Sequence, residues 1–289
     1  MADFRFLDDL IHSEAKEIVL DCDIVLGDGE EQDYPEGIRL DVGDLIIDGC
    51  GHTIDARSKA LIFYNTSNVT LKNITLKNGL RAIYNFRGNL NISNSALLEN
   101  ASEVTGGAIY NYWGEVDISN SRLLCNSSGC HGGAIFNFNG DVNVSGSEFS
   151  QNHAESDGGA IFNGSRLNII DCLFDGNVSN GSGGAIYDNR GEINITDSRF
   201  LANSSHGTFG GGAIHKNRGI LNISGSELSG NSAKSDGGAI FAIDCEMSLE
   251  GSKISNNTSS QACVYTKIMQ NLVMDGCEFE NNLPDDVFR

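Results

Sequence analysis

Four acidic residues recur at a spacing that could support chemistry. Glu115 and Asp141 are 26 residues apart, and so are Asp171 and Asp197. If the chain stacks with that period, the two carboxyl groups of each pair lie about 4.8 Å apart, near the roughly 5 Å separation that retaining glycosidases use. Arg166 falls in the same column as Asp141, which favours plain charge pairing between exposed turns. The pairs are therefore candidates for catalysis, with solvated turn acids as the simpler interpretation.

The overall charge bears on this choice. The chain has 19 basic and 39 acidic side chains, a net charge of −20. That charge opposes unassisted binding of an acidic polysaccharide and repels nucleic acid, so we expect no nucleic-acid partner. The longest apolar runs are about five residues, against the roughly 20 that a membrane helix needs, so we expect no direct membrane insertion. We expect a protein that is not an enzyme.

Cysteine and histidine offer a second possible chemistry around one variable segment. Cys125 and Cys130 flank this segment and are close enough in sequence to form a disulfide. Together with His131, and with His153 about one repeat later, they could instead bind a soft metal. No recognised zinc spacing is present, so we expect no metal there.

Two further groups of potential ligands are expected to be structural. Cys172 and Cys277 occupy a repeat position that is otherwise serine, which indicates small buried fillers. Asp28, Glu30 and Asp33 share one acidic loop that could take Ca²⁺ weakly, but the ligand spacing of a calcium hand is missing. We expect a solvated loop and no cofactor.

An internal repeat positions all of these residues. The tripeptide GGA recurs at intervals of 26, 26, 25, 28 and 26 residues. Between its copies lies a stretch of alternating apolar and polar residues, such as Leu90-Asn-Ile92, which is typical of a short strand with one buried face. The GGA motifs begin at Gly106, Gly132, Gly158, Gly183, Gly211 and Gly237.

Each repeat also contains an apolar-x-x-Asn motif. Asn tolerates a left-handed backbone, and stacked side-chain amides can hydrogen-bond from one coil to the next. We therefore predict a structural asparagine ladder. Its members are Asn100, Asn126, Asn152, Asn177, Asn203, Asn231, Asn257 and Asn282.

Three short strand signals per repeat, with no helical periodicity between them, determine the predicted fold. Such a repeat can bury its apolar faces only by coiling, so that each strand pairs in parallel with its copy one turn later. The sequence predicts an all-β, three-faced parallel β-helix of about ten coils in a single domain. Residues 1–37 would form a capping helix and the first strands, and residues 38–289 the repeat.

The two ends of this solenoid are expected to differ. Phe4, Leu7, Leu10 and Ile11 recur at helical spacing and predict a short amphipathic helix that caps the N-terminal end of the core. The C-terminal segment offers no comparable cap. We expect that end to continue into, or to contact, another domain.

The residue after the isoleucine of the GGAI-type motif is aromatic in most coils. If the isoleucine points inward, these rings point outward and can stack on sugars or on a partner protein. If the parity is reversed, they are ordinary core. Apolar residues on both sides leave both alternatives open and favour the core only slightly. These candidate ligand-binding residues are Tyr84, Tyr110, Phe136, Phe162 and Tyr187.

Three surface features complete the sequence-based picture. Coil length varies mainly between the ladder asparagine and the next glycine pair, so insertions fall on one edge, where repeat proteins usually place recognition. Fifteen N-x-S/T sequons suit a secreted glycoprotein, although any repeat rich in Asn and Ser generates them by chance. A weaker hypothesis is that an outward-facing column of asparagines, interrupted at Asp117, binds ice or another crystal surface. That column comprises Asn91, Asn143, Asn168, Asn194 and Asn222.

The repeat motifs resemble those of a known group of proteins. GGAIYN at Gly106, GGAIFN at Gly132 and Gly158, and GGAIYD at Gly183, each followed by an FxxN-type motif, resemble the repeats of adhesin-like surface proteins of methanogenic archaea. They are also similar to those of chlamydial polymorphic outer-membrane proteins. The resemblance covers nearly the whole chain and is carried by scaffold motifs.

The resemblance implies a right-handed, pectate-lyase-like β-helix that acts in adhesion at the cell surface. Its partners would be glycans or surface proteins of a host or microbe. An extracellular location follows from the resemblance alone, because the first residues lack the basic and apolar blocks of a signal peptide. A polysaccharide-degrading lyase or glycoside hydrolase on the same scaffold is the alternative function.

Overall fold

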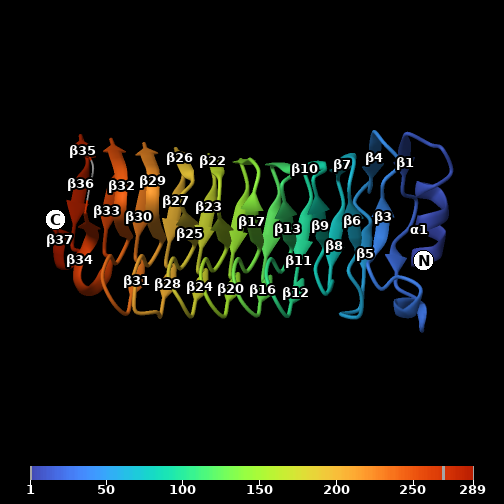
Figure 1. Ribbon diagram of the computed structural model, residues 1–289, viewed down its shortest axis with the longest axis horizontal. Coiled ribbons are helices and arrows are strands. Elements are labelled where there is room, and N and C mark those ends of the chain that lie inside the picture. The colour runs from blue at the N-terminus through green and yellow to red at the C-terminus, as the bar shows by residue number, and fades with distance from the viewer. Residues whose placement is uncertain (1, 269–270, 289) are drawn as a thin grey trace.

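The chain forms a rod of stacked coils with a helix at its N-terminal end (Figure 1). The computed structural model describes residues 2–268 and 271–288, so Met1 and Arg289, the outermost residues of the predicted ranges, lie outside it. Strands pair in parallel with their copies in the neighbouring coils. The predicted all-β parallel β-helix of about ten coils with a short N-terminal helix is confirmed.

Two series of paired strands carry the GGA motifs and the alternating stretches. The GGA series comprises β3 (Ile38–Leu40), β6 (Phe63–Asn65), β9 (Ile83–Phe86), β13 (Ile109–Tyr112), β17 (Ile135–Asn139), β21 (Ile161–Asn163), β25 (Ile186–Asn189) and the first parts of β29 (Ile214–Ser224) and β32 (Ile240–Glu250). The alternating series comprises β1 (Glu17–Val19), β4 (Leu45–Asp48), β7 (Asn68–Lys72), β10 (Asn89–Ser93), β14 (Glu115–Ser119), β18 (Val142–Ser145), β22 (Arg166–Ile170), β26 (Glu192–Thr196), the second parts of β29 and β32, and β35 (Asn271–Asp275).

Two further series close each coil. The third series precedes the ladder asparagines and comprises β2 (Ile24–Val25), β5 (Thr53–Asp55), β8 (Thr75–Lys77), β11 (Ala96–Leu98), β15 (Arg122–Leu124), β19 (Glu148–Ser150), β23 (Leu173–Asp175), β27 (Arg199–Leu201), β30 (Glu227–Ser229), β33 (Lys253–Ser255) and β36 (Glu278–Glu280). A short series, which the sequence did not reveal, follows the asparagines. It comprises β12 (Ala101–Ser102), β16 (Ser127–Ser128), β20 (His153–Ala154), β24 (Val178–Ser179), β28 (Ser204–Ser205) and β31 (Ser232–Ala233), and continues into the starts of β34 (Thr258–Lys267) and β37 (Leu283–Phe288). The later parts of β34 and β37 continue the GGA series.

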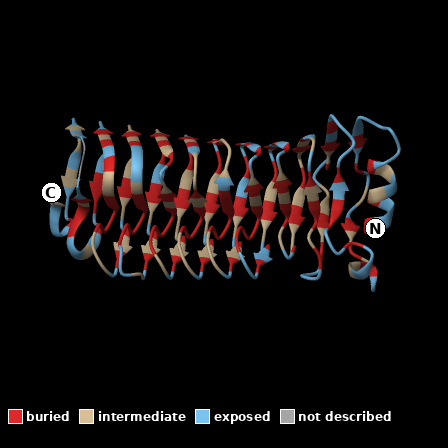
Figure 2. Ribbon diagram, in the orientation of Figure 1, coloured by how far each residue is buried: buried red, intermediate tan, exposed pale blue. Residues whose placement is uncertain are grey.

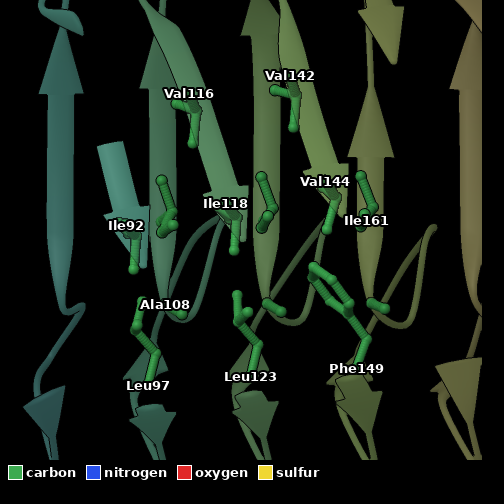
Figure 3. Close-up of a cluster of buried hydrophobic side chains, with 14 of the residues drawn as sticks. Ile92, Leu97, Ala108, Val116, Ile118, Leu123, Val142, Val144, Phe149 and Ile161 are labelled. Carbon is green, nitrogen blue, oxygen red and sulfur yellow. The ribbon is translucent and has the colours of Figure 1, made fainter. Parts of the chain in front are cut away.

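One apolar core runs through the rod. Ile109, Ile135 and Ile161 pair directly in successive coils and are fully buried. Figure 3 shows how Leu97, Leu123 and other core side chains follow one another in the same way. Because strand residues alternate between two faces, buried and exposed positions alternate along each coil (Figure 2).

The predicted N-terminal cap is confirmed as helix α1 (Phe4–Ile11), which buries Phe4, Leu7 and Ile11 against the first coil. Asp3 caps the helix by accepting a hydrogen bond from the backbone N–H of Phe6 at 3.0 Å. No helix in the described part of the chain has the length and apolar character needed to cross a membrane.

The acidic loop supports this helix, so the expectation of a freely solvated loop is wrong for Glu30. This residue begins the short 3₁₀ helix Glu30–Gln32, is buried, and accepts hydrogen bonds from the backbone N–H groups of Phe4 and Arg5 at 3.2 and 3.1 Å. Asp33 pairs with Arg5 at 2.9 Å. The loop therefore places negative charge at the N-terminus of α1, where negative charge stabilises a helix.

The predicted asparagine ladder is present and buried. Asn126 illustrates the pattern: its backbone N–H and its Nδ2 donate to Asn152 Oδ1 at 3.0 and 3.1 Å, and Nδ2 also donates to the carbonyl of Leu97. The backbone explanation for asparagine was wrong, because the left-handed residue lies one position earlier, as at Cys125 and Gln151. Asparagine is used here for its buried amide, which both donates and accepts.

A second buried ladder was not predicted. Each GGAIYN-type motif ends in an asparagine whose Nδ2 donates to the Oδ1 of the next coil, over distances of 2.7 to 2.9 Å from Asn65 to Asn163. After Asn163 the same position holds Asp188 and then Lys216. The signal was visible in the sequence, since the asparagine recurs with every early copy of the motif. The ladder runs through Asn65, Asn85, Asn111, Asn137 and Asn163.

Candidate functional site

The aromatic residues of the GGA series form one continuous stack on the outside of the rod, which we call the ring column. The preceding isoleucines, such as Ile83 and Ile109, are fully buried, so strand alternation turns the rings outward. The sequence slightly favoured a core position for these rings, and that prediction was wrong, because the rings lie on the outer face of the strands. Consecutive ring centroids are 4.8 to 5.2 Å apart from Tyr64 through Tyr84, Tyr110, Phe136, Phe162 and Tyr187.

Mutual stacking hides much of this column. Tyr84, Tyr110, Phe162 and Tyr187 are half-buried, while Phe136 is only 8% exposed. Further along, the stack continues through His215, Phe241 and Tyr265. Offset stacking of this kind is favourable, and it holds each ring in a fixed orientation.

A second group of rings, the corner cluster, was not predicted. Two positions after the ring column, Phe86, Tyr112 and Phe138 stack at 5.4 and 5.3 Å, and Trp113 packs edge-on against Tyr112 at 6.5 Å. Trp113 and Phe138 are 53% and 48% exposed. The repeated aromatic-x-aromatic pattern was present in the sequence and would have revealed the cluster. Large exposed aromatic side chains on rigid strands are typical of a binding surface.

Arginines lie over the rings at the N-terminal part of the ring column. The Arg81 guanidinium lies 5.7 and 5.2 Å from the ring centroids of Tyr84 and Tyr110, and Arg87 lies 5.3 Å from that of Phe86. These contacts are cation–π interactions. Burial raises the pKa of both tyrosines, so their phenols stay neutral at physiological pH.

Arg81 also ties a variable edge segment to the ring column. Its guanidinium donates to the carbonyls of Thr105 and Gly106 at 2.6 and 2.9 Å and to Ser102 Oγ at 2.9 Å. In a later coil His131, at the end of the next variable segment, lies 4.8 Å from the ring centroid of Phe162. The variable edge and the ring column are therefore adjacent parts of one surface.

The structure separates the two carboxylate pairs. Glu115 and Asp141 stand at the start of the alternating series, next to the corner cluster, and Asp141 pairs with Arg166 at 3.3 Å. The predicted charge pairing is confirmed there. Asp171 and Asp197 stand at the opposite ends of these strands, in exposed turns with left-handed backbones. The four residues therefore do not form a single site.

Asp171 and Asp197 do share a small open hollow. Arg122, Arg199 and Glu148 also line it, but each arginine already pairs with a glutamate, as Arg122 does with Glu148 at 3.1 Å. The hollow thus combines acidic and basic groups above a turn.

The outward asparagine column is a third ladder. Asn143 Nδ2 donates to Asp117 Oδ1 and Asn168 Nδ2 to Asn143 Oδ1, both at 2.7 Å, and Asn194 and Asn222 continue the chain at 3.0 and 2.9 Å. Together with outward Ser and Thr side chains, the column borders an open groove along four coils. The amides bond to one another along the rod, which leaves fewer of them free to order ice.

All eight cysteines lie in the described part of the chain, and none of them forms a disulfide there. Cys125 is exposed and lies 3.6 Å from Gln151 Oε1, so the proposed bridge to Cys130 is not formed. No group of three His, Cys, Asp or Glu side chains in the described residues is arranged to hold a metal. Cys172 replaces a serine as predicted: it is buried, and its Sγ donates to the carbonyl of Ile170 at 3.2 Å.

Many of the glycosylation sequons are inaccessible. Their asparagines belong to one of the two buried ladders, so the folded protein cannot present them to a glycosylating enzyme. These fully buried asparagines are Asn65, Asn100, Asn126, Asn163, Asn177, Asn203 and Asn257. Seven of the fifteen sequons are therefore by-products of the two buried ladders.

Comparison with known proteins identifies the repeat. Residues 146–164, 171–189 and 225–243 match the Chlamydia polymorphic membrane protein repeat. Each matched segment contains one ladder asparagine and one GGA motif, the two scaffold elements of the coil. No curated protein and no solved structure matches the chain. The repeat and the parallel β-solenoid together indicate a surface or structural protein of the adhesin-like kind.

Proposed function

We propose that the protein is a non-enzymatic, extracellular adhesin-like β-helix that binds glycans or partner surfaces through the corner cluster and the ring column. The observation that carries the proposal is the exposure of Trp113 and Phe138 on stacked, rigid strands. Aromatic faces bind the apolar faces of sugars, and rings already fixed by stacking lose little entropy on binding.

The surroundings of the corner cluster supply polar contacts. Arg87 and Glu115 stand beside it, and the variable edge lies along the ring column. Charged and amide side chains at the rim of an aromatic surface can hydrogen-bond to sugar hydroxyls or to a protein partner. An extracellular location is part of the same proposal and rests on the similarity of the repeats.

The test is retention on an array of plant and microbial glycans. Trp113→Ala should reduce retention at least tenfold, because a central aromatic contact is typically worth about 2 kcal/mol or more. Phe6→Ala is the matched control, since Phe6 is also an exposed ring but lies on helix α1 at the end of the rod. Phe209→Ala probes the variable edge, because Phe209 is an exposed ring in a variable segment and its centroid lies 6.5 Å from that of Phe241 in the ring column. Unchanged retention of the Trp113 variant, with loss in the Phe209 variant, would move the site to the variable edge.

A polysaccharide-degrading enzyme is the second candidate, and the hollow at Asp171 and Asp197 favours it. Release of reducing ends from a polysaccharide panel measures this activity. Turnover that disappears in Asp171→Asn or Glu115→Gln, with the fold intact, would replace the binding proposal. Release at the level of a buffer blank would leave the adhesin-like proposal in place.

A further inference from the structure

The second asparagine ladder ends in a buried pair of opposite charges. Asp188 on β25 and Lys216 on β29 are direct partners in neighbouring coils, and both side chains are fully buried. Lys216 Nζ contacts Asp188 Oδ1 and the carbonyl oxygen of Gly191. In the next coil the position is held by Ala242, so the lysine reaches back toward the aspartate.

Both side chains of the pair are enclosed by the neighbouring coils, and Glu192 is a further acidic group whose charge acts on Lys216. Cys245, fully buried in the next coil, faces Lys216, and burial raises the pKa of its thiol to about 11, so it stays neutral. Two buried charges without water are costly, and the alternative to an ion pair is transfer of a proton to give the neutral amine and the neutral acid.

Burial drives the pair toward that neutral state. Desolvation raises the pKa of Asp188 and lowers the pKa of Lys216, in both cases against the attraction of the partner. A neutral amine has a free electron pair, and a protonated carboxyl group can lose hydroxide as water. The two groups are held in contact by strand register, where the effective concentration of aligned groups can reach about 10⁵ M or more.

We propose that Lys216 and Asp188 are joined by an intramolecular isopeptide bond that the folded chain forms by itself. Lys216 Nζ attacks Asp188 Cγ and the new C–N bond forms. One proton of the neutral amine passes to the hydroxyl oxygen of the protonated carboxyl group, the bond between Cγ and that oxygen breaks, and the oxygen leaves as water, so that the amide nitrogen keeps one hydrogen. No oxidant, reductant or activating group is consumed.

The local hydrogen bonds suit such a step. Asn163 Nδ2 donates to Asp188 Oδ2, and the backbone N–H of Gly191 donates to Oδ1 at 3.0 Å. Fixed donors of this kind stabilise the oxygen that gains negative charge in the tetrahedral intermediate. The product would join two neighbouring coils covalently along the rod.

The test is the intact mass of the denatured full-length protein. We expect it to fall below the mass of the sequence by one water molecule, whereas Asp188→Ala and Lys216→Met should each show the full mass of their own sequence. A tryptic digest of the wild type should contain a branched peptide joining the two residues and no cleavage after Lys216.

A partly exposed pair in the same digest is the internal control. Lys72 Nζ lies 3.3 Å from Asp48 Oδ2, but its side chain is solvated. Cleavage after Lys72 should be normal. A folded wild-type protein that keeps the full sequence mass after prolonged incubation, with cleavage after Lys216, would overturn the proposal, and this result does not depend on whether either variant folds.

Discussion

His215 shows how the stack accommodates an ionisable ring. Its imidazole stacks between Tyr187 and Phe241, with centroid distances of 4.7 and 4.9 Å, and its Nδ1 lies 3.3 Å from the carbonyl oxygen of Gly210. Burial lowers the pKa of His215 to about 4, although the Gly210 carbonyl and the charge of Asp157 act in the opposite direction. The residue therefore serves as a neutral aromatic ring at neutral pH.

This shift predicts a pH dependence of stability. The folded-state pKa lies below the ordinary value of 6.5, so the unfolded chain takes up the proton first as the pH falls. The contribution of neutral His215 to the free energy of unfolding is complete above pH 6.5. It falls by up to about 3 kcal/mol between pH 6.5 and about 4. Urea unfolding of the wild type and of His215→Phe, which keeps the stacking, measures this loss. Equal loss in both proteins would contradict the assignment.

At the scale of the element, the turn before each ladder asparagine needs a left-handed residue. Two coils use glycine there, Gly176 and Gly230, whereas another uses Ala202 with φ of 52°. A side chain with Cβ in this conformation costs roughly 1 kcal/mol. Ala202 nevertheless adopts the left-handed conformation, because the buried hydrogen bonds of the next residue, Asn203, fix the turn.

Two reciprocal substitutions follow from this geometry. Ala202→Gly should raise the free energy of unfolding by about 0.5–1 kcal/mol, and Gly230→Ala should lower it by a similar amount. The methyl group added at Gly230 meets its nearest neighbour, the backbone nitrogen of Ala202, at 3.9 Å, so the effect comes from the backbone alone. Denaturant titration measures both. A change of the same sign in both variants would refute the explanation.

At the scale of the whole molecule, the rod is a one-dimensional array. Each coil contacts mainly its two neighbours, so its stability depends on their interfaces, and the first coil relies on α1 to cover it. An open end would expose core residues such as Ile24 and unpaired strand edges. The cap is thus a requirement of the architecture.

Removal of a contact between α1 and the first coil should destabilise only the N-terminal end of the rod. Leu7→Asn deletes a fully buried side chain and buries an amide, at a local cost of about 3 kcal/mol. Hydrogen exchange should become faster in β1 and β2 and remain unchanged in β29 and β32. Phe6→Asn, at a helix position that is 41% exposed, is the control and should leave both regions unchanged. Faster exchange along the whole rod would mean that the coils unfold as one unit.

The architecture could be predicted from the sequence because stacking converts a period along the chain into contact in space. The GGA spacing, the alternation around Leu90 and the column of Asn126 each specify one neighbour per coil. The helical spacing of Phe4, Leu7 and Ile11 likewise identified the cap. These signals are local and repeat many times, so the sequence by itself determined the fold and one ladder.

Only the tertiary structure decided which surface is available for binding. Tyr110 and its neighbours have apolar residues on both sides, so their direction depended on which face of the strand the core occupies. The exposure of Trp113, the separation of Glu115 from Asp171 and the burial of Lys216 depend on how turns close and what covers them. Those properties arise from packing between coils, and no single repeat encodes them.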